Sequence, residues 1–146
     1  MKKIIEYGII GTVGGIAYMI IELLWKASTH WTMGIAGGIS FIVMYLVHNK
    51  MPGVNILYRA LLCGASVTAI EFVTGFIVNI KLGWDVWDYS ARSFNILGQV
   101  CPTYMLIWIV LSIPASEICK ILKCIIGRHL EAKVDCKIKT EKEISG

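Results

Sequence analysis

Two glutamates stand inside long apolar stretches of this 146-residue chain, at Glu22 and Glu71. An ionised carboxylate in hydrocarbon costs at least a few kcal/mol unless a neighbouring group compensates it. Two carboxylates crowded in a low-dielectric site favour the holding of a proton near neutral pH. The same pair also attracts a cation, or a cationic group of a solute. These two residues are therefore the first candidates for a proton, ion or solute site, with Glu71 ranked before Glu22.

Further polar residues follow each glutamate toward one predicted membrane surface. The connecting segment at residues 83–90 is rich in tryptophan and carries two aspartates. We expect polar contacts beside the glutamates from three residues, Asn79, Asp88 and Gln99.

Structural explanations compete with this hypothesis. Glu22 has Lys26 four residues later, a spacing that favours an ion pair at the interface. Glu71 has no basic residue close by in its own stretch, but Arg92 or the backbone of another helix can serve as its partner. Asp88, with Asp85, has the residue type that caps the start of a helix.

The elements that position these residues are four apolar stretches, each long enough to cross a bilayer as a helix. They lack the alternation of polar and apolar residues found in membrane barrel strands. We therefore predict an all-α integral membrane protein with four transmembrane helices in residues 1–118. The expected helices cover about 4–25, 31–47, 57–80 and 94–118, and Met51-Pro52-Gly53 divides them into two helical hairpins. Residues 119–146 are expected to form a charged cytoplasmic tail, mobile from Gly127 onward. As an alternative for its first part, residues 116–126 continue as an amphipathic helix along the inner membrane surface.

Composition and charge agree with this class of protein. The chain is 56% hydrophobic and only 16% charged, and its mean hydropathy is +0.68. Most basic residues fall at one membrane surface, and the other surface has only Lys26, Lys81 and Arg92. The positive-inside rule then places both termini in the cytoplasm of a multi-pass cell-membrane protein. The net charge of +4 follows from these flanking residues, so no nucleic acid is expected as a partner.

Small residues recur at helical spacing and predict close helix contacts. The candidates for helix packing are Gly11, Gly15, Gly34, Gly38, Gly64 and Gly75. In the fourth stretch, Pro102 is expected to kink the helix and free the carbonyl of Gly98.

The sequence has none of the common catalytic motifs. No P-loop, zinc-protease or serine-hydrolase signature occurs, and the three histidines are scattered at the ends of the predicted helices. Neither an enzyme, a cofactor nor a metal site is expected. Any ATP used must be bound by a separate ATPase chain.

Several motifs carry a resemblance to a known family. They are Glu22-Leu23-Leu24-Trp25, His30-Trp31-Thr32-Met33-Gly34, Ile70-Glu71-Phe72-Val73-Thr74-Gly75, Val86-Trp87-Asp88-Tyr89-Ser90 and Phe94-Asn95-Ile96-Leu97-Gly98-Gln99-Val100-Cys101. Through them the chain resembles the putative type IV ABC-transporter permease family, the CmpB-like small bacterial membrane proteins. The resemblance covers roughly residues 8–112, and it implies a role in transport.

These observations lead to one functional hypothesis and one alternative. The hypothesis is a permease-like transporter subunit that moves a small solute or ion and uses an intramembrane carboxylate to hold a proton or cation. Because four helices are few for a complete pathway, we expect a homo-oligomer or other transporter chains in the bilayer. The alternative is a small self-associating scaffold or holin-like protein, in which glycine seams join the copies and no transport takes place.

Overall fold

The computed structural model describes the backbone of residues 2–144 and the side chains of residues 3–128. Within that range the chain is all-helical and contains no strand, as predicted. Its elements are α1 (Lys2–Lys26), α2 (Trp31–Lys50), α3 (Ile56–Gly75), the π-helical segment η1 (Phe76–Lys81) and α4 (Pro102–Ile144). Four helical segments are long and apolar enough to cross a membrane: Lys3–Lys26, Trp31–Lys50, Ile56–Lys81 and Pro102–Arg128.

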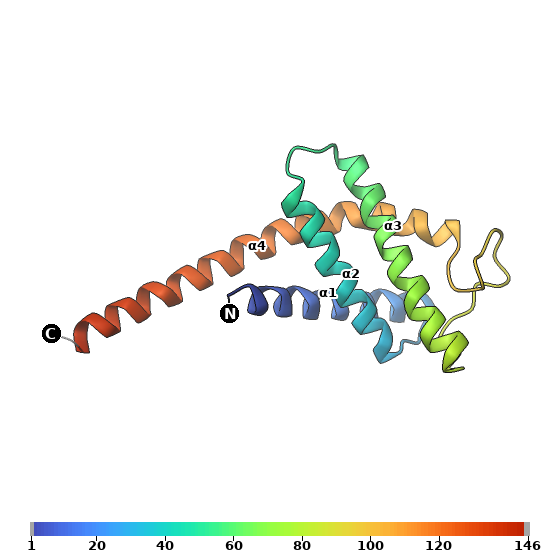
Figure 1. Cartoon of the computed structure of the whole chain (residues 1–146), viewed down its shortest axis with the longest axis horizontal. Helices are drawn as coiled ribbons and strands as arrows, with labels where there is room; N and C mark the ends of the chain where they lie inside the picture. Colours follow the sequence, from blue (N-terminus) through green and yellow to red (C-terminus); the bar gives the residue numbers. More distant parts are fainter. Residues whose placement is uncertain (1, 145–146) are drawn as a thin grey trace.

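The four helices pack mainly as two pairs, α1 with α2 and α3 with α4. In Figure 1 both termini lie toward one end of the molecule, and the connection between η1 and α4 lies at the opposite end. The chain therefore has two distinct ends, which we call the terminal end and the loop end. The segment 82–101 at the loop end is called the outer loop, after its predicted position outside the membrane.

Close approach of α1 and α2 depends on several glycines, and at two of them the glycine faces the backbone of the other helix. A Cβ added to Gly15 would lie 2.5 Å from the carbonyl oxygen of Gly34, and one added to Gly38 would lie 2.7 Å from that of Gly11. Such contacts require a shift of the backbone, because no flexible side chain is there to move away. The glycine seams of these two helices thus face each other within one chain.

Two glycines of α3, Gly64 and Gly75, allow this helix to approach its neighbours closely. A Cβ on Gly64 would press on Ile109 of α4, and a Cβ on Gly75 would reach the outer loop at Gln99 and Trp87. Glycine at these positions lets α3 contact both the helix that follows it and the loop between them.

The start of the fourth helix differs from the prediction. The sequence predicted a helix from about residue 94 with a kink at Pro102, whereas α4 begins at Pro102. Asn95 explains the difference, because its side chain donates to the carbonyls of Ser90 and Arg92 and accepts from the N–H of Gly98. Its hydrogen bonds close turns that compete with a helix. Proline at the first helical position is favourable because its missing N–H needs no partner there.

The same turns use the carbonyl that a kink would have freed. The oxygen of Gly98 accepts from the N–H of Tyr89 at 2.7 Å. Gly98 itself has a φ of +68°, and an added Cβ would meet the Ser90 hydroxyl at 2.6 Å and the Asp88 carboxylate at 2.7 Å. Glycine is required at this position by both its conformation and its surroundings.

The end of the fourth helix also differs from the prediction. We expected a boundary near residue 118 and a mobile tail from Gly127, but α4 continues as one helix of 43 residues to Ile144. A helix of that length spans about 65 Å, roughly twice the hydrocarbon thickness of a bilayer. Its last part extends away from the other helices (Figure 1). The charged segment 119–144 is thus helical.

Candidate functional site

Glu71 lies in the middle of the helix bundle and is 3% exposed. The Tyr18 hydroxyl of α1 donates to its Oε1 at 2.9 Å. The Trp108 indole N–H of α4 donates to its Oε2 at 2.8 Å. The carboxyl group of Glu71 on α3 is therefore hydrogen-bonded to both α1 and α4. Its two donors, the Tyr18 hydroxyl and the Trp108 indole N–H, are neutral groups.

The two donors differ in what they can do when a proton binds. A tyrosine hydroxyl can donate or accept, whereas an indole N–H can only donate. If Glu71 takes up a proton on Oε1, it can donate to Tyr18 while Oε2 still accepts from Trp108. The arrangement can thus satisfy both the ionised and the protonated form of the carboxyl group.

Tyr18 and Trp108 also line a cleft of ≈ 510 Å³ at the loop end. The cleft lies between α1, α4 and the outer loop, and Tyr18 stacks on Trp108 with ring centroids 5.2 Å apart. Six aromatic side chains line it: Tyr18, Trp25, Trp87, Tyr89, Tyr104 and Trp108. Its charged side chains are Glu22, Lys26 and Asp88. Its size is within the usual range for a small-molecule site, about 300–1,000 Å³.

Glu22 lines the cleft as one half of an ion pair. Its Oε1 lies 2.7 Å from the Lys26 Nζ, and its Oε2 accepts from the Thr29 hydroxyl. The Lys26 ammonium also reaches the Val86 carbonyl at 3.4 Å, which connects the end of α1 to the outer loop. The interfacial ion pair considered from the sequence is therefore present, and it lies on the cleft wall.

Asn79 connects η1 to the outer loop. Its Nδ2 donates to the Gln99 Oε1 at 2.8 Å and to the Trp87 carbonyl at 2.9 Å, and its Oδ1 accepts from the Val86 N–H at 2.7 Å. The π-helical turn around it has an i to i+5 hydrogen bond, from Leu82 N–H to Ile77 O at 3.0 Å. Such turns are rare and often occur at functional sites.

Gln99, near the end of the outer loop, is the side chain to which Asn79 donates. It is 5% exposed. Its backbone carbonyl accepts from the Trp87 indole N–H at 2.9 Å, and its side-chain Nε2 donates to the Leu97 carbonyl at 2.9 Å. Asn79 and Gln99, which we considered as solute contacts, thus bond to the backbone and side chains of the outer loop and hold one wall of the cleft.

Asp88 lies at the exposed mouth of the cleft. Its Oδ1 accepts from the Ser90 hydroxyl at 2.5 Å and from the Ser90 N–H at 2.8 Å. These hydrogen bonds, the hydroxyl first, hold the pKa of Asp88 below its ordinary value. Asp88 therefore stays ionised at neutral pH and gives the mouth a negative charge.

Tyr89 lies beside Asp88 and stacks on Tyr104 of α4, with ring centroids 4.3 Å apart. Burial, and next the charge of Glu71, raise the pKa of the Tyr89 hydroxyl well above its ordinary value. Tyr89 thus keeps its proton, and it places an aromatic face and a neutral hydroxyl on the cleft wall.

The aromatic lining is the part of the site that sequence reasoning did not identify. Trp108 could have been singled out from the sequence, since it lies near the middle of the predicted helix 94–118, whereas the other tryptophans cluster near the predicted membrane surface. Tyr18 is on the same helical face as Glu22, four residues before it. No prediction from the sequence paired Tyr18 or Trp108 with Glu71.

Comparison with known proteins gives one result. No curated protein and no solved structure matches the chain. A family model described as "Putative ABC-transporter type IV" (CmpB) matches residues 7–134, a range that includes the outer loop and all of the membrane-length helices except the first four residues of Lys3–Lys26. The chain therefore belongs to this family, and it is a multi-pass membrane protein of the transporter type.

Proposed function

We propose that this chain is a transporter subunit that binds a small cationic solute in the loop-end cleft and carries an exchangeable proton on Glu71. One observation carries the proposal. Each carboxylate oxygen of Glu71 is hydrogen-bonded to an aromatic side chain that also lines the cleft. A change in the charge of Glu71 therefore alters the hydrogen bonds of Tyr18 and Trp108, two side chains that form the cleft wall.

The surroundings of Glu71 favour a proton on this residue. Its described hydrogen-bond partners are neutral, and removal of a carboxylate from water is costly without a compensating charge. Tyr18 lets the group change its protonation state without loss of a hydrogen bond. A group of this kind is suited to take up a proton in one state of a transport cycle and release it in another.

The lining of the cleft favours a cation. Aromatic faces attract cations through the ring quadrupole, by about 0.5–2 kcal/mol for each well-placed ring. Asp88 adds negative charge at the mouth, and Glu22 adds a carboxylate that is shared with Lys26. A compact organic ammonium ion fits this combination of aromatic walls and carboxylates.

The number of helices and the family support assembly with other chains. Four membrane helices are few for a complete pathway, and the family is described as an ABC-transporter family. We infer that further transporter chains, or further copies, complete the pathway and that a separate ATPase supplies the energy. This chain itself catalyses no reaction.

Two measurements test the proposal, and the first needs no partner chain. Tetraethylammonium is titrated into the purified protein while tryptophan fluorescence is recorded, because Trp25, Trp87 and Trp108 line the cleft. We expect saturable binding that is lost in Trp108→Ala and weakened in Asp88→Asn. Signals equal to wild type in both variants would remove the cleft as a cation site.

The second measurement is proton flux in vesicles that contain a pH-sensitive dye and in which the chain is reconstituted with its partner chains and the ATPase. We expect proton flux that accompanies ATP-driven transport of the cation, and its loss in Glu71→Gln. The matched control is Glu117→Gln, because Glu117 is on α4 with a side chain 59% exposed. Equal flux in Glu71→Gln and the control would exclude a proton-carrying role for Glu71.

A further inference from the structure

A second hollow of ≈ 530 Å³ lies at the other end of the spans, where α2, α3 and α4 meet. Its basic lining residues are His48 of α2, Arg59 of α3, and Lys120 and Lys123 of α4. None of them takes part in the loop-end cleft. We call this hollow the basic pocket.

The charges in the basic pocket are only partly offset. Lys120 pairs with Glu117, with Nζ and Oε1 2.6 Å apart. Lys123 donates to the neutral Asn49 side chain at 2.8 Å. Three cationic side chains thus share one hollow with a single carboxylate at its edge, so the net charge there is positive. Cations from different helices repel one another unless an anion lies between them.

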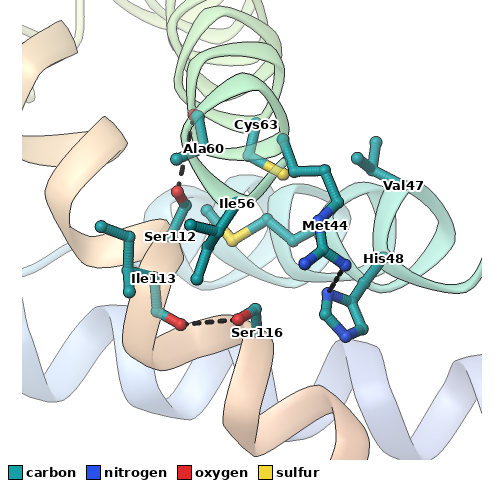
Figure 2. A pocket seen from close by; sticks show the side chains of 10 residues that line it. Met44, Val47, His48, Ile56, Ala60, Cys63, Ser112, Ile113 and Ser116 are labelled. Carbon is teal, nitrogen blue, oxygen red and sulfur yellow. Dashed lines mark hydrogen bonds between the residues drawn. The ribbon is translucent and has the colours of Figure 1, made fainter. Parts of the chain in front are cut away.

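Arg59 and His48 orient each other at the wall of this pocket. The Arg59 Nη1 lies 3.2 Å from the His48 Nδ1, and a dashed line at His48 in Figure 2 marks this contact. Because a guanidinium only donates, the His48 Nδ1 is the acceptor, which leaves Nε2 as the N–H of the ring. Arg59 uses one donor in this contact, and its fork geometry suits a phosphate oxygen pair.

An apolar crevice leads from the same two residues into the bundle. Its lining includes Met44, Ile56 and Ile113, together with the hydroxyl groups of Ser112 and Ser116 (Figure 2). The crevice is narrow, ≈ 10 Å³, so it does not enclose an acyl chain. It does place apolar surface directly beside the charged groups, as occurs where a headgroup region borders hydrocarbon.

We propose that the basic pocket binds the phosphate of an anionic phospholipid. The pocket lies where α2 ends and α3 begins, so its charges are at the level of a lipid headgroup. The predicted orientation places this end in the cytoplasmic leaflet, which is rich in anionic lipid, and basic pockets between membrane helices on that side bind such headgroups. The bound lipid joins α3 to α4 through Arg59, Lys120 and Lys123.

The experiment counts lipids bound to the full chain. The protein is purified in nanodiscs that contain phosphatidylcholine with or without phosphatidylglycerol, and retained lipid is measured by native mass spectrometry. We expect wild type to retain phosphatidylglycerol selectively. Lys120→Gln combined with Lys123→Gln should weaken this binding roughly 25-fold, since each basic residue near a membrane surface contributes about fivefold.

Two controls make the result decisive. Lys50→Gln removes a basic residue at the same end of the spans that does not line the pocket, and it should retain the lipid as wild type does. Arg59→Gln should lose it, and the exposed lysines provide the test if Arg59→Gln does not fold. Equal retention in the double lysine variant and in Lys50→Gln would overturn the proposal.

A separate titration identifies the source of the phosphate. Inorganic phosphate and glycerol phosphate are added to the protein in phosphatidylcholine nanodiscs. We expect neither to bind at millimolar concentration. Saturable binding of inorganic phosphate that the double lysine variant loses would overturn the lipid assignment and make the pocket a site for a soluble phosphate.

Discussion

The indole N–H of Trp108 lies 2.8 Å from the Glu71 carboxylate, and the Trp108 ring forms part of the cleft wall. Glu71 is on α3 and Trp108 is on α4, and the segment η1 and the outer loop separate them in the sequence. One side chain therefore contacts both the most buried acid of the bundle and the space open to a solute.

Replacement of Trp108 with phenylalanine should destabilise the protein by about 1–3 kcal/mol, because one oxygen of a buried carboxyl group loses its donor. The measurement is thermal unfolding of the purified protein in detergent. The matched control is Trp31→Phe, since Trp31 is 58% exposed. Equal stability of the two variants would show that the Trp108 hydrogen bond contributes nothing.

The contact between Tyr18 and Glu71 should appear as a coupling energy. In a double-mutant cycle with Tyr18→Phe and Glu71→Gln, we expect an interaction of about 0.5–3 kcal/mol, the range for residues in direct contact. Unfolding free energies of the four proteins provide the measurement. Strictly additive effects would argue against a hydrogen bond between these side chains.

Loss of the Asn79 side chain should release the outer loop. In Asn79→Ala, the Val86 N–H and the Trp87 carbonyl lose their partner, and amide hydrogen exchange in residues 82–101 should become roughly tenfold faster or more. The matched control is Asn49→Ala at the other end of the spans, where Asn49 bonds to Lys123. Similar loop exchange in both variants would contradict the role of Asn79 as the residue that holds the loop.

The seam between α1 and α2 should tolerate no added methyl group. Gly15→Ala places a Cβ 2.5 Å from the Gly34 carbonyl oxygen and should destabilise the chain by about 1–3 kcal/mol. Gly8→Ala is the control, because a Cβ there meets nothing within 4 Å. If Gly15→Ala instead dissociated an oligomer and left the monomer stable, the self-associating alternative would gain support.

Much of the fold could be predicted because lipid permits few solutions. Apolar stretches of about 20 residues must form helices in a bilayer, so hydropathy alone placed the four spans. The same argument failed at residues 94–101, which continue the apolar stretch through Phe94, Ile96 and Leu97. Turn formation there depends on the Asn95 side chain and on positive φ angles at Phe94 and Leu97, neither of which hydropathy registers.

The sequence could predict which types of residue belong to the candidate site, but it could not predict how they are arranged in space. Glu71 stood out because an acid in an apolar helix needs a partner, but that partner, Tyr18, lies 53 residues away. A single sequence contains no signal for such a pairing. Asn79 and Gln99 were predicted to contact a solute, and in the structure both side chains bond to the outer loop. Their residue types do not reveal whether they bond to a solute or to the loop.

The most direct test of the account is an infrared titration of Glu71. The carbonyl band of protonated carboxylic acids is followed from acid to alkaline pH in wild type, Glu71→Gln and Glu117→Gln. We predict a titrating band in wild type and in Glu117→Gln that is absent in Glu71→Gln and shifted in frequency by Tyr18→Phe. An identical titrating band in wild type and Glu71→Gln would contradict the claim that Glu71 holds an exchangeable proton.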